Sequence, residues 1–154
     1  MRYFTIELRD KLSNTLNKDY ESYEKNWYEN LKRYWEDFEK YESRFPKSFS
    51  NQYKKHAFHD FMIRHIHLNE VELKNRIKYN AELLIEDGNE KYVIIYEDVS
   101  KYDIAIDSLD YDTAIFLYSE LFPLSTNGFS HEIICGKKNR IYIEFKKLKF
   151  KKVK

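Results

Sequence analysis

The chain has 154 residues, a length typical of one domain, and its 27 basic and 26 acidic side chains nearly cancel. This balance excludes a general electrostatic attraction to nucleic acid or to an anionic membrane. The single cysteine, Cys135, excludes an internal disulfide bond and favours a reducing, cytoplasmic location. The opening residues also lack the apolar run of a signal peptide. Since the chain holds 14 Tyr, 11 Phe and 2 Trp, we expect a core built largely from aromatic rings.

Two helical patterns open the chain. The first has an apolar residue at every fourth position from Phe4 to Leu16, with Thr5 placed to cap it. The second covers residues 20–45 and ends at Pro46, which cannot continue a helix. Its apolar residues recur at spacings of three and four and so share one narrow face of a long helix. They are Tyr20, Tyr23, Trp27, Leu31, Tyr34, Phe38, Tyr41 and Phe45.

Tyr28 and Trp35 lie seven positions apart at the edge of this aromatic face. One interpretation is that both rings widen the contact between the helix and the core. The other is that they anchor a protein partner, because Trp and Tyr contribute most per residue at interfaces. A homo-oligomer built through the same two side chains is a third alternative.

From residue 59 onward, the apolar pattern becomes typical of strands. Apolar runs at residues 81–86 and 91–97, separated by a turn at Gly88, predict a hairpin. Further strands are expected at residues 61–68, 101–106, 113–121, 129–135 and 141–153, whereas residues 68–79 are expected to form a loop or a short helix. The sequence therefore predicts an α+β fold over residues 1–154. Helices in residues 1–46 would pack on an antiparallel sheet of five to seven strands in residues 59–154.

Four of the five histidines lie within residues 56–67. On a strand, His65 and His67 would point to the same face at a spacing that can bind zinc, with His59 or Asp60 as a third ligand. Alternatively, these histidines line a solvated strand face. We favour this second interpretation because the sequence lacks the repeated Cys or carboxylate partners of a metal motif. We therefore expect neither a bound metal nor a cofactor.

Catalytic patterns are weak throughout the sequence. His59 and Asp60 could form an acid–base pair, but adjacent residues entering a strand point apart, so we expect one of them to bond the backbone instead. Cys135 and His131 would share a strand face with Ile133 between them, which predicts a small buried cysteine rather than a nucleophile. Glycine motifs for phosphates or dinucleotides are absent from the sequence. We expect no catalytic residues.

Charge is distributed unevenly along the chain. Residues 82–120 hold eleven acids and two lysines, whereas residues 137–154 hold nine basic residues and one acid. The basic end could contact phosphates, but lysines that alternate with apolar residues also prevent an edge strand from pairing with other molecules. The central acids predict a solvated loop and a candidate partner surface made by Asp103, Asp107, Asp110 and Asp112.

Three segments resemble small uncharacterised proteins of low-GC Gram-positive bacteria and their phages. The first is the opening Met1-Arg2-Tyr3-Phe4-Thr5, and the second is His59-Asp60-x-x-Ile63. The third is the closing run at residues 115–120, 128–134 and 140–148, which is similar to the terminal hairpins of those families. Many of their genes lie among toxin–antidote cassettes, so the resemblance implies an immunity role.

These observations predict a non-catalytic binding protein that inhibits or sequesters a macromolecular partner, in the manner of an immunity or anti-defence protein. We expect a protein partner, because an acidic face speeds capture of a basic target, and neither nucleic acid nor a membrane. The alternative is a metal- or ligand-dependent enzyme that uses residues 56–67. A structural homo-oligomer is the further alternative.

Overall fold

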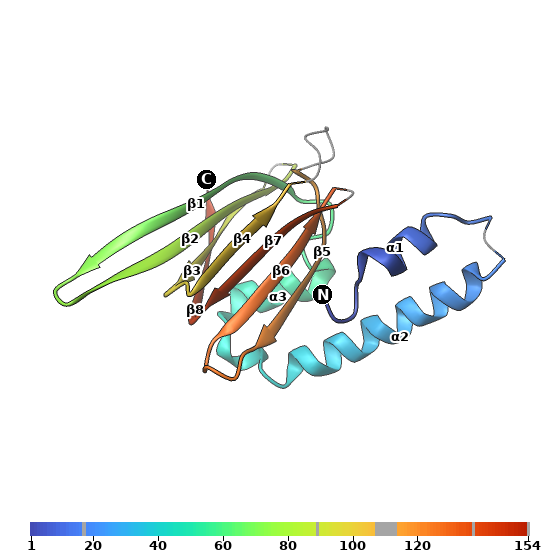
Figure 1. Cartoon of the computed structure of the whole chain (residues 1–154), viewed down its shortest axis with the longest axis horizontal. Helices are drawn as coiled ribbons and strands as arrows, with labels where there is room; N and C mark the ends of the chain where they lie inside the picture. Colours follow the sequence, from blue (N-terminus) through green and yellow to red (C-terminus); the bar gives the residue numbers. More distant parts are fainter. Residues whose placement is uncertain (17, 89, 107–113, 137, 154) are drawn as a thin grey trace.

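The computed structural model describes residues 1–16, 18–88, 90–106, 114–136 and 138–153. Within these ranges the chain forms three α-helices and eight strands, which confirms the predicted α+β class. The strands form two antiparallel sheets of four strands each, rather than one sheet of five to seven. Figure 1 shows the helices gathered on one side of the sheets, with α2 running past their ends.

The first helix, α1, covers Ile6–Leu12 and confirms the predicted cap, because the Thr5 hydroxyl accepts a hydrogen bond from the N–H of Leu8. Leu16 lies beyond this helix and is 92% exposed. The long helix, α2, covers Tyr20–Glu39 and is therefore shorter than predicted. Its aromatic face nevertheless continues through a 3-10 turn at Glu42–Arg44, because Tyr41 and Phe45 are buried too. Pro46 excludes helical backbone at Phe45, which is extended.

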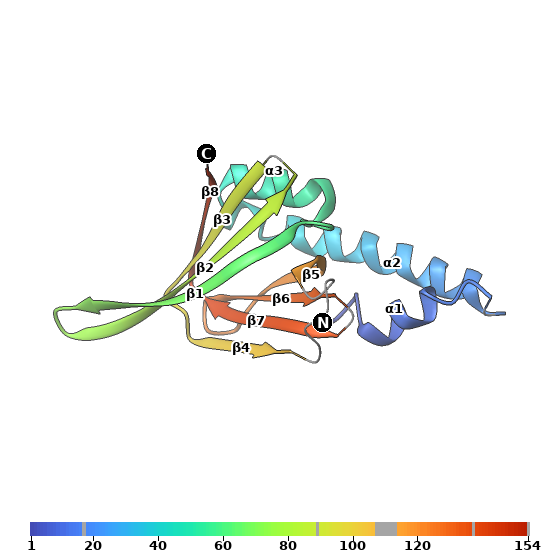
Figure 2. The same cartoon turned by 90° about the horizontal axis from the view of Figure 1, so that it is seen from above.

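Helix α3 covers Lys47–His56 and fills the space between the two sheets. Its buried Phe49 packs on Phe150 of the first sheet, with ring centroids 5.6 Å apart. The Tyr53 ring lies 6.2 Å from the His131 ring of the second sheet. Figure 2 shows the sheets spreading apart like a V, with the helices on the open side. The helices therefore carry the rings that close the wedge between the sheets.

The first sheet has the strand order β1-β2-β3-β8 and the second has the order β4-β7-β6-β5. The chain passes from one to the other after β3 and returns at Lys146, whose N–H donates to the Glu97 carbonyl. These two crossings explain why one predicted sheet is in fact two. The strands of the first sheet are Met62–Leu73, Arg76–Asp87, Glu90–Glu97 and Lys147–Val153 for β1, β2, β3 and β8. Those of the second are Lys101–Ala105, Phe116–Pro123, Phe129–Cys135 and Asn139–Phe145 for β4, β5, β6 and β7.

The prediction of a loop or short helix at residues 68–79 is wrong. These residues are the outer halves of β1 and β2, paired from Leu68 opposite Ala81 to Leu73 opposite Arg76. Val71 and Leu73 alternate with Glu70 and Glu72, which is a strand pattern. The charged residues interrupt the apolar run that would have predicted a strand. The predicted hairpin between β2 and β3 is confirmed, with Asp87 opposite Glu90.

Buried side chains from the helices and both sheets form a single hydrophobic cluster. The largest that are fully enclosed are mostly aromatic, as predicted: Tyr34, Phe38, Phe49, Tyr53, Phe58, Phe61, Tyr96, Phe116, Phe129 and Phe145. In the ranges that the structure describes, no helix is both long and apolar enough to span a membrane.

Candidate functional site

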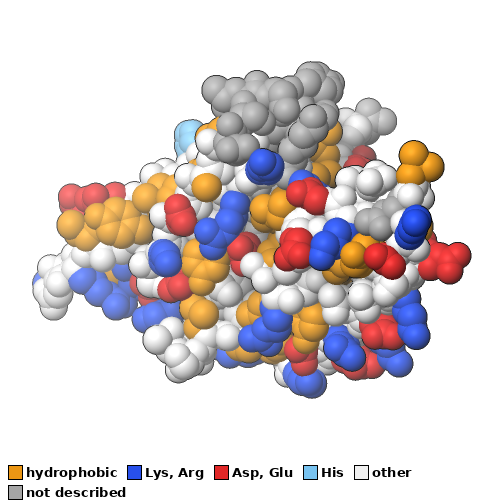
Figure 3. Space-filling view, turned by 45° about the vertical axis from the view of Figure 1, so that its right-hand side comes forward, with side chains coloured by type: hydrophobic (Ala, Val, Ile, Leu, Met, Phe, Trp, Pro, Cys, Tyr) orange, Lys and Arg blue, Asp and Glu red, His pale blue; other side chains and the backbone are white. Residues whose placement is uncertain are grey.

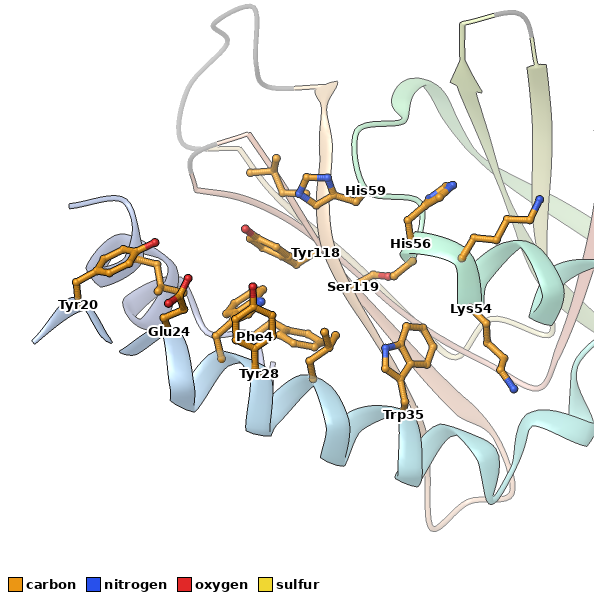
Figure 4. Close-up of a pocket in the computed structure, with 16 residues that line it drawn as sticks. Phe4, Tyr20, Glu24, Tyr28, Trp35, Lys54, His56, His59, Tyr118 and Ser119 are labelled. Carbon is orange, nitrogen blue, oxygen red and sulfur yellow. The ribbon is translucent and has the colours of Figure 1, made fainter. Parts of the chain in front are cut away.

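A groove of about 440 Å³ lies between α2, the end of α3 and strand β5 (Figure 4). Six aromatic side chains among the described residues line it, including Trp27, Tyr28 and Trp35 on the α2 side and Tyr118 on the β5 side. Its rim is polar, with Glu24 on α2 at one end and Lys54, Lys55 and His56 on α3 toward the other (Figure 4). This volume lies within the range of ligand-binding pockets in proteins. We refer to this feature as the aromatic groove.

The inner wall of the aromatic groove is a stack of rings from three separate segments. Phe4 packs on Trp27 and Trp27 packs on Tyr118, with ring centroids 4.9 and 4.8 Å apart. Phe4 itself is buried and comes from the segment before α1. The opening residues, which were not predicted to form a site, therefore build part of the candidate site.

The structure places the two candidate anchor residues at different depths of the groove. Trp35 is half-buried and contacts the rings of Tyr34, Phe38 and Tyr53 at 5.1, 5.7 and 5.6 Å. It thus widens the core contact of α2 and also forms part of the groove floor. Tyr28 is 61% exposed and stands on the groove lip. The predicted partner role of both rings, and the alternative homo-oligomer through them, remain predictions.

His59 and Asp60 lie close together, and the expectation that they point apart is wrong. The His59 Nδ1 atom is 3.0 Å from Asp60 Oδ2. The chain reaches this arrangement through a sharp turn in which Ala57, Phe58 and Asp60 all have positive φ angles, of 50°, 60° and 68°. Such angles are unfavourable for residues other than glycine, so surrounding contacts must hold the turn.

Two features hold this turn. The Phe58 ring is completely buried. The N–H of Asp60 donates to the Phe116 carbonyl at 2.9 Å, and the N–H of Phe116 donates to the Phe61 carbonyl at 2.8 Å. The imidazole of His59 consequently reaches the aromatic groove, where its ring lies 5.6 Å from that of Tyr118.

The other candidate residues lie away from the aromatic groove. His65 and His67 share the outer face of β1, as predicted, with ring centroids 5.0 Å apart, and both are exposed. Across the described part of the chain, no three His, Cys, Asp or Glu side chains gather closely enough to hold a metal ion. Asp103 lies on β4, at the opposite edge of the second sheet from β5, and is 3.5 Å from Arg140. Asp107, Asp110 and Asp112 fall outside the described residues.

Sequence reasoning missed a buried carboxylate that fixes the opening segment. Glu120 is 1% exposed. It accepts hydrogen bonds from the N–H groups of Arg2, Tyr3 and Phe4 at 2.5, 2.7 and 2.6 Å. Phe4 is thereby held against Trp27. The available signal was an acid within an otherwise apolar strand, since a buried charge requires several hydrogen bonds.

A second unforeseen feature is a group of buried hydroxyls behind the groove. The Tyr34 hydroxyl bonds to that of Tyr53 at 2.6 Å and accepts from the N–H of Leu121 at 2.9 Å. The Tyr53 hydroxyl also lies 3.0 Å from that of Ser119. Burial raises the pKa of both phenols, so they stay neutral hydrogen-bonding groups.

His131 and Cys135 are both buried in the second sheet. The His131 Nδ1 atom bonds to the Tyr96 hydroxyl at 2.8 Å, and burial lowers the His131 pKa to about 3. Burial raises the pKa of the Cys135 thiol to about 12. A thiol with this pKa stays protonated at neutral pH and is a poor nucleophile.

No protein-family model matches the chain, and no curated protein shows significant similarity to it.

Proposed function

We propose that this chain is a binding protein that inhibits or sequesters a partner protein, in the manner of an immunity or anti-defence protein, and that the aromatic groove is its docking surface. The observation that supports this most is Tyr28, an aromatic side chain 61% exposed beside a groove whose walls are also aromatic. Tyrosine and tryptophan are the residues that most often dominate binding energy when a partner buries them.

The groove also suggests what the partner presents. Its walls favour apolar or aromatic side chains, and its volume of about 440 Å³ accommodates a few of them. The rim bears Glu24 on the α2 side and Lys55 on the α3 side, so it would orient a partner segment that carries both signs of charge. The neighbouring Lys54 is already paired with Glu42 at 3.0 Å. Asp103 has no part in this groove, because β4 and β5 form opposite edges of the second sheet.

Affinity capture from the native host tests the proposal. We expect the wild-type chain to retain one protein in stoichiometric amount, and the Tyr28→Ala variant to lose it. Ile104→Ala is the control, because Ile104 is 36% exposed but lies on β4, at the opposite edge of the second sheet from the groove. Equal capture by wild type and Tyr28→Ala, or capture lost equally in both variants, would count against this docking surface.

A second candidate function, a ligand-dependent enzyme, is favoured by the contact between His59 and Asp60. A carboxylate 3.0 Å from one ring nitrogen can orient an imidazole for acid–base chemistry. The Asp60→Asn variant separates the two candidates, because Asp60 does not line the aromatic groove and its substitution should leave capture of a protein partner nearly unchanged. Indole is a suitable probe for a ligand site. Saturable shifts of the His59 and Tyr118 NMR signals, weakened in Asp60→Asn, would favour this second candidate.

A further inference from the structure

Strands β1 and β2 extend well beyond the body of the first sheet. Strand β3 pairs with β2 only from Ala81 to Asp87, so residues 68–79 continue as a ribbon of two strands. The base of this ribbon is held by the segment after β3, since the N–H of Val99 donates to the Tyr79 carbonyl at 2.8 Å. Figures 1 and 2 show this ribbon projecting away from the rest of the molecule. We refer to residues 68–79 as the arm. An isolated two-stranded ribbon is only marginally stable in water, so an arm of this length is expected to gain stability from a neighbour.

The arm exposes apolar side chains on the face that is buried elsewhere in the sheet. Leu68, Ile77 and Tyr79 are 46%, 54% and 42% exposed. In the β1–β2 register, they share a face with Ala81, which is fully buried. Figure 3 shows hydrophobic side chains, with acidic ones beside them, over the left-hand end of the molecule where the arm lies. The core face of the sheet thus continues into solvent along the arm.

The two edges of the first sheet differ in how they are protected. Strand β8, at one edge, carries four lysines among its seven residues: Lys147, Lys149, Lys151 and Lys152. Lysines in such number discourage pairing with other molecules. Strand β1, at the other edge, has neither lysine nor proline. Its start is covered by a bridge from Met62 to Ile115, and a register shift follows at Ile63 to His65. Among the described residues, no strand pairs with the outer edge of residues 64–73.

We propose that this open edge binds a second copy of the same chain, with the two β1 strands pairing antiparallel across a two-fold axis. The first sheet of each copy has four strands, and the two would join into one sheet of eight strands. Residues 68–73 of each β1 would lie beside the first half of the other copy's free edge. This inference goes beyond the proposed function, because it concerns a surface distinct from the aromatic groove.

The charges of β1 favour a second copy over an unrelated strand. Arg64, His65 and His67 lie in the first half of the free edge, whereas Glu70 and Glu72 lie in the second half. Arg64 already contacts Glu86 of its own chain at 2.5 Å, but its side chain is still 49% exposed. Antiparallel self-pairing brings the acidic half of each copy alongside Arg64 of the other, while parallel pairing would place like charges together. A two-fold contact of this kind closes after two copies. Pairing along the whole free edge places the axis at Leu68 or Asn69.

Disulfide cross-linking tests both the contact and its register. The Leu68→Cys and Asn69→Cys variants are each oxidised mildly, and we expect one of them to form a covalent dimer. Leu16→Cys is the control, because Leu16 is 92% exposed and remote from β1. The native Cys135 is 2% exposed and adds little background. The wild-type chain should sediment at about twice 19.0 kDa.

A charge variant completes the test. In Glu70→Lys/Glu72→Lys both halves of the free edge are basic, so we expect the dimer to dissociate at least about tenfold more readily. Glu21→Lys/Glu29→Lys, with both changes on exposed positions of α2, should leave the dimer intact. Circular dichroism checks that each variant folds. A wild-type chain that sediments at 19.0 kDa would overturn the proposal. Cross-linking no faster than in Leu16→Cys would also overturn it, as would a dimer that is unaffected by Glu70→Lys/Glu72→Lys. Pairing of β1 only with a different protein would overturn it too.

Discussion

The two halves of α2 carry the same aromatic pattern but use it differently. In the second half, Tyr34 and Phe38 are fully buried among the rings of α3 and the 3-10 turn. In the first half, Tyr20, Tyr23 and Trp27 are only half-buried, and Tyr28 at the edge of the stripe is 61% exposed. The difference arises because the second half lies against α3 and β5, while the first half extends past the sheets beside α1 (Figure 1). A helical aromatic stripe therefore identifies a buried face only where something is present to cover it.

The largest expected loss of stability from one substitution in the buried half of α2 is at Phe38. Its ring contacts those of Tyr34, Trp35, Tyr41, Phe45 and Tyr53. We expect Phe38→Ala to lower the free energy of unfolding by about 3–5 kcal/mol, because it removes a fully buried ring and leaves a cavity. Urea denaturation measures this loss. The control Glu29→Ala, on the exposed face of the same helix, should change it by less than about 0.5 kcal/mol. A loss below about 1 kcal/mol for Phe38→Ala would contradict the account.

The packing of Trp27, in the less buried half of α2, depends on Glu120, because Glu120 holds Phe4 against the Trp27 ring. In Glu120→Gln, a neutral amide replaces a carboxylate that accepts three backbone N–H groups. We expect a loss of about 2–3 kcal/mol, with faster amide hydrogen exchange at residues 2–4. The matched control is Glu36→Gln, since Glu36 is largely exposed. Unchanged exchange at residues 2–4 would show that the opening segment is held by other contacts.

Acid should lower the free energy of unfolding through His131, whose buried ring lies 6.2 Å from that of Tyr53 beneath the second half of α2. The pKa of His131 is lowered to about 3 in the folded chain, whereas an unfolded histidine has a pKa near 6.5. Below pH 6.5 the unfolded chain binds the proton and the folded chain does not, so stability falls as pH falls. We expect a loss of about 2 kcal/mol between pH 7 and pH 5, measured by urea denaturation at each pH. His131→Phe should flatten this dependence, and an unchanged slope in that variant would assign it to other groups.

A smaller effect is expected from the hydroxyl of Tyr34. Tyr34→Phe keeps the ring but leaves the N–H of Leu121 without its buried acceptor. The expected loss is about 1–2 kcal/mol in the free energy of unfolding. Tyr23→Phe, on the first half of α2, should cost less than about 0.5 kcal/mol. Equal losses in the two variants would mean that the halves of α2 do not differ in hydrogen bonding.

Much of the fold could be predicted because local patterns were strong. The Thr5 cap, the aromatic face of α2 and the strand Phe129–Cys135 follow directly from residue type and spacing. The division into two sheets could not be predicted, since it depends on where the chain crosses at Glu97 and Lys146 rather than on either strand alone. The arm was missed because its apolar residues are interrupted by exposed charges.

The candidate site was harder to predict than the fold. Tyr28 and Trp35 were found from their angular position on one helix, which sequence spacing encodes. Phe4 and Tyr118, which line the same groove, come from distant segments, and no local pattern places them together. The contact between His59 and Asp60 requires three positive φ angles in four residues, which residues other than glycine rarely adopt.

The free energy of unfolding of Tyr28→Ala tests the central claim most directly. If the first half of α2 is a docking surface, the exposed Tyr28 ring contributes to binding and not to folding. We therefore predict that urea denaturation of the isolated variant matches that of wild type within about 0.5 kcal/mol. A loss of about 2 kcal/mol or more would place Tyr28 in the core and contradict the assignment of the aromatic groove as a binding surface.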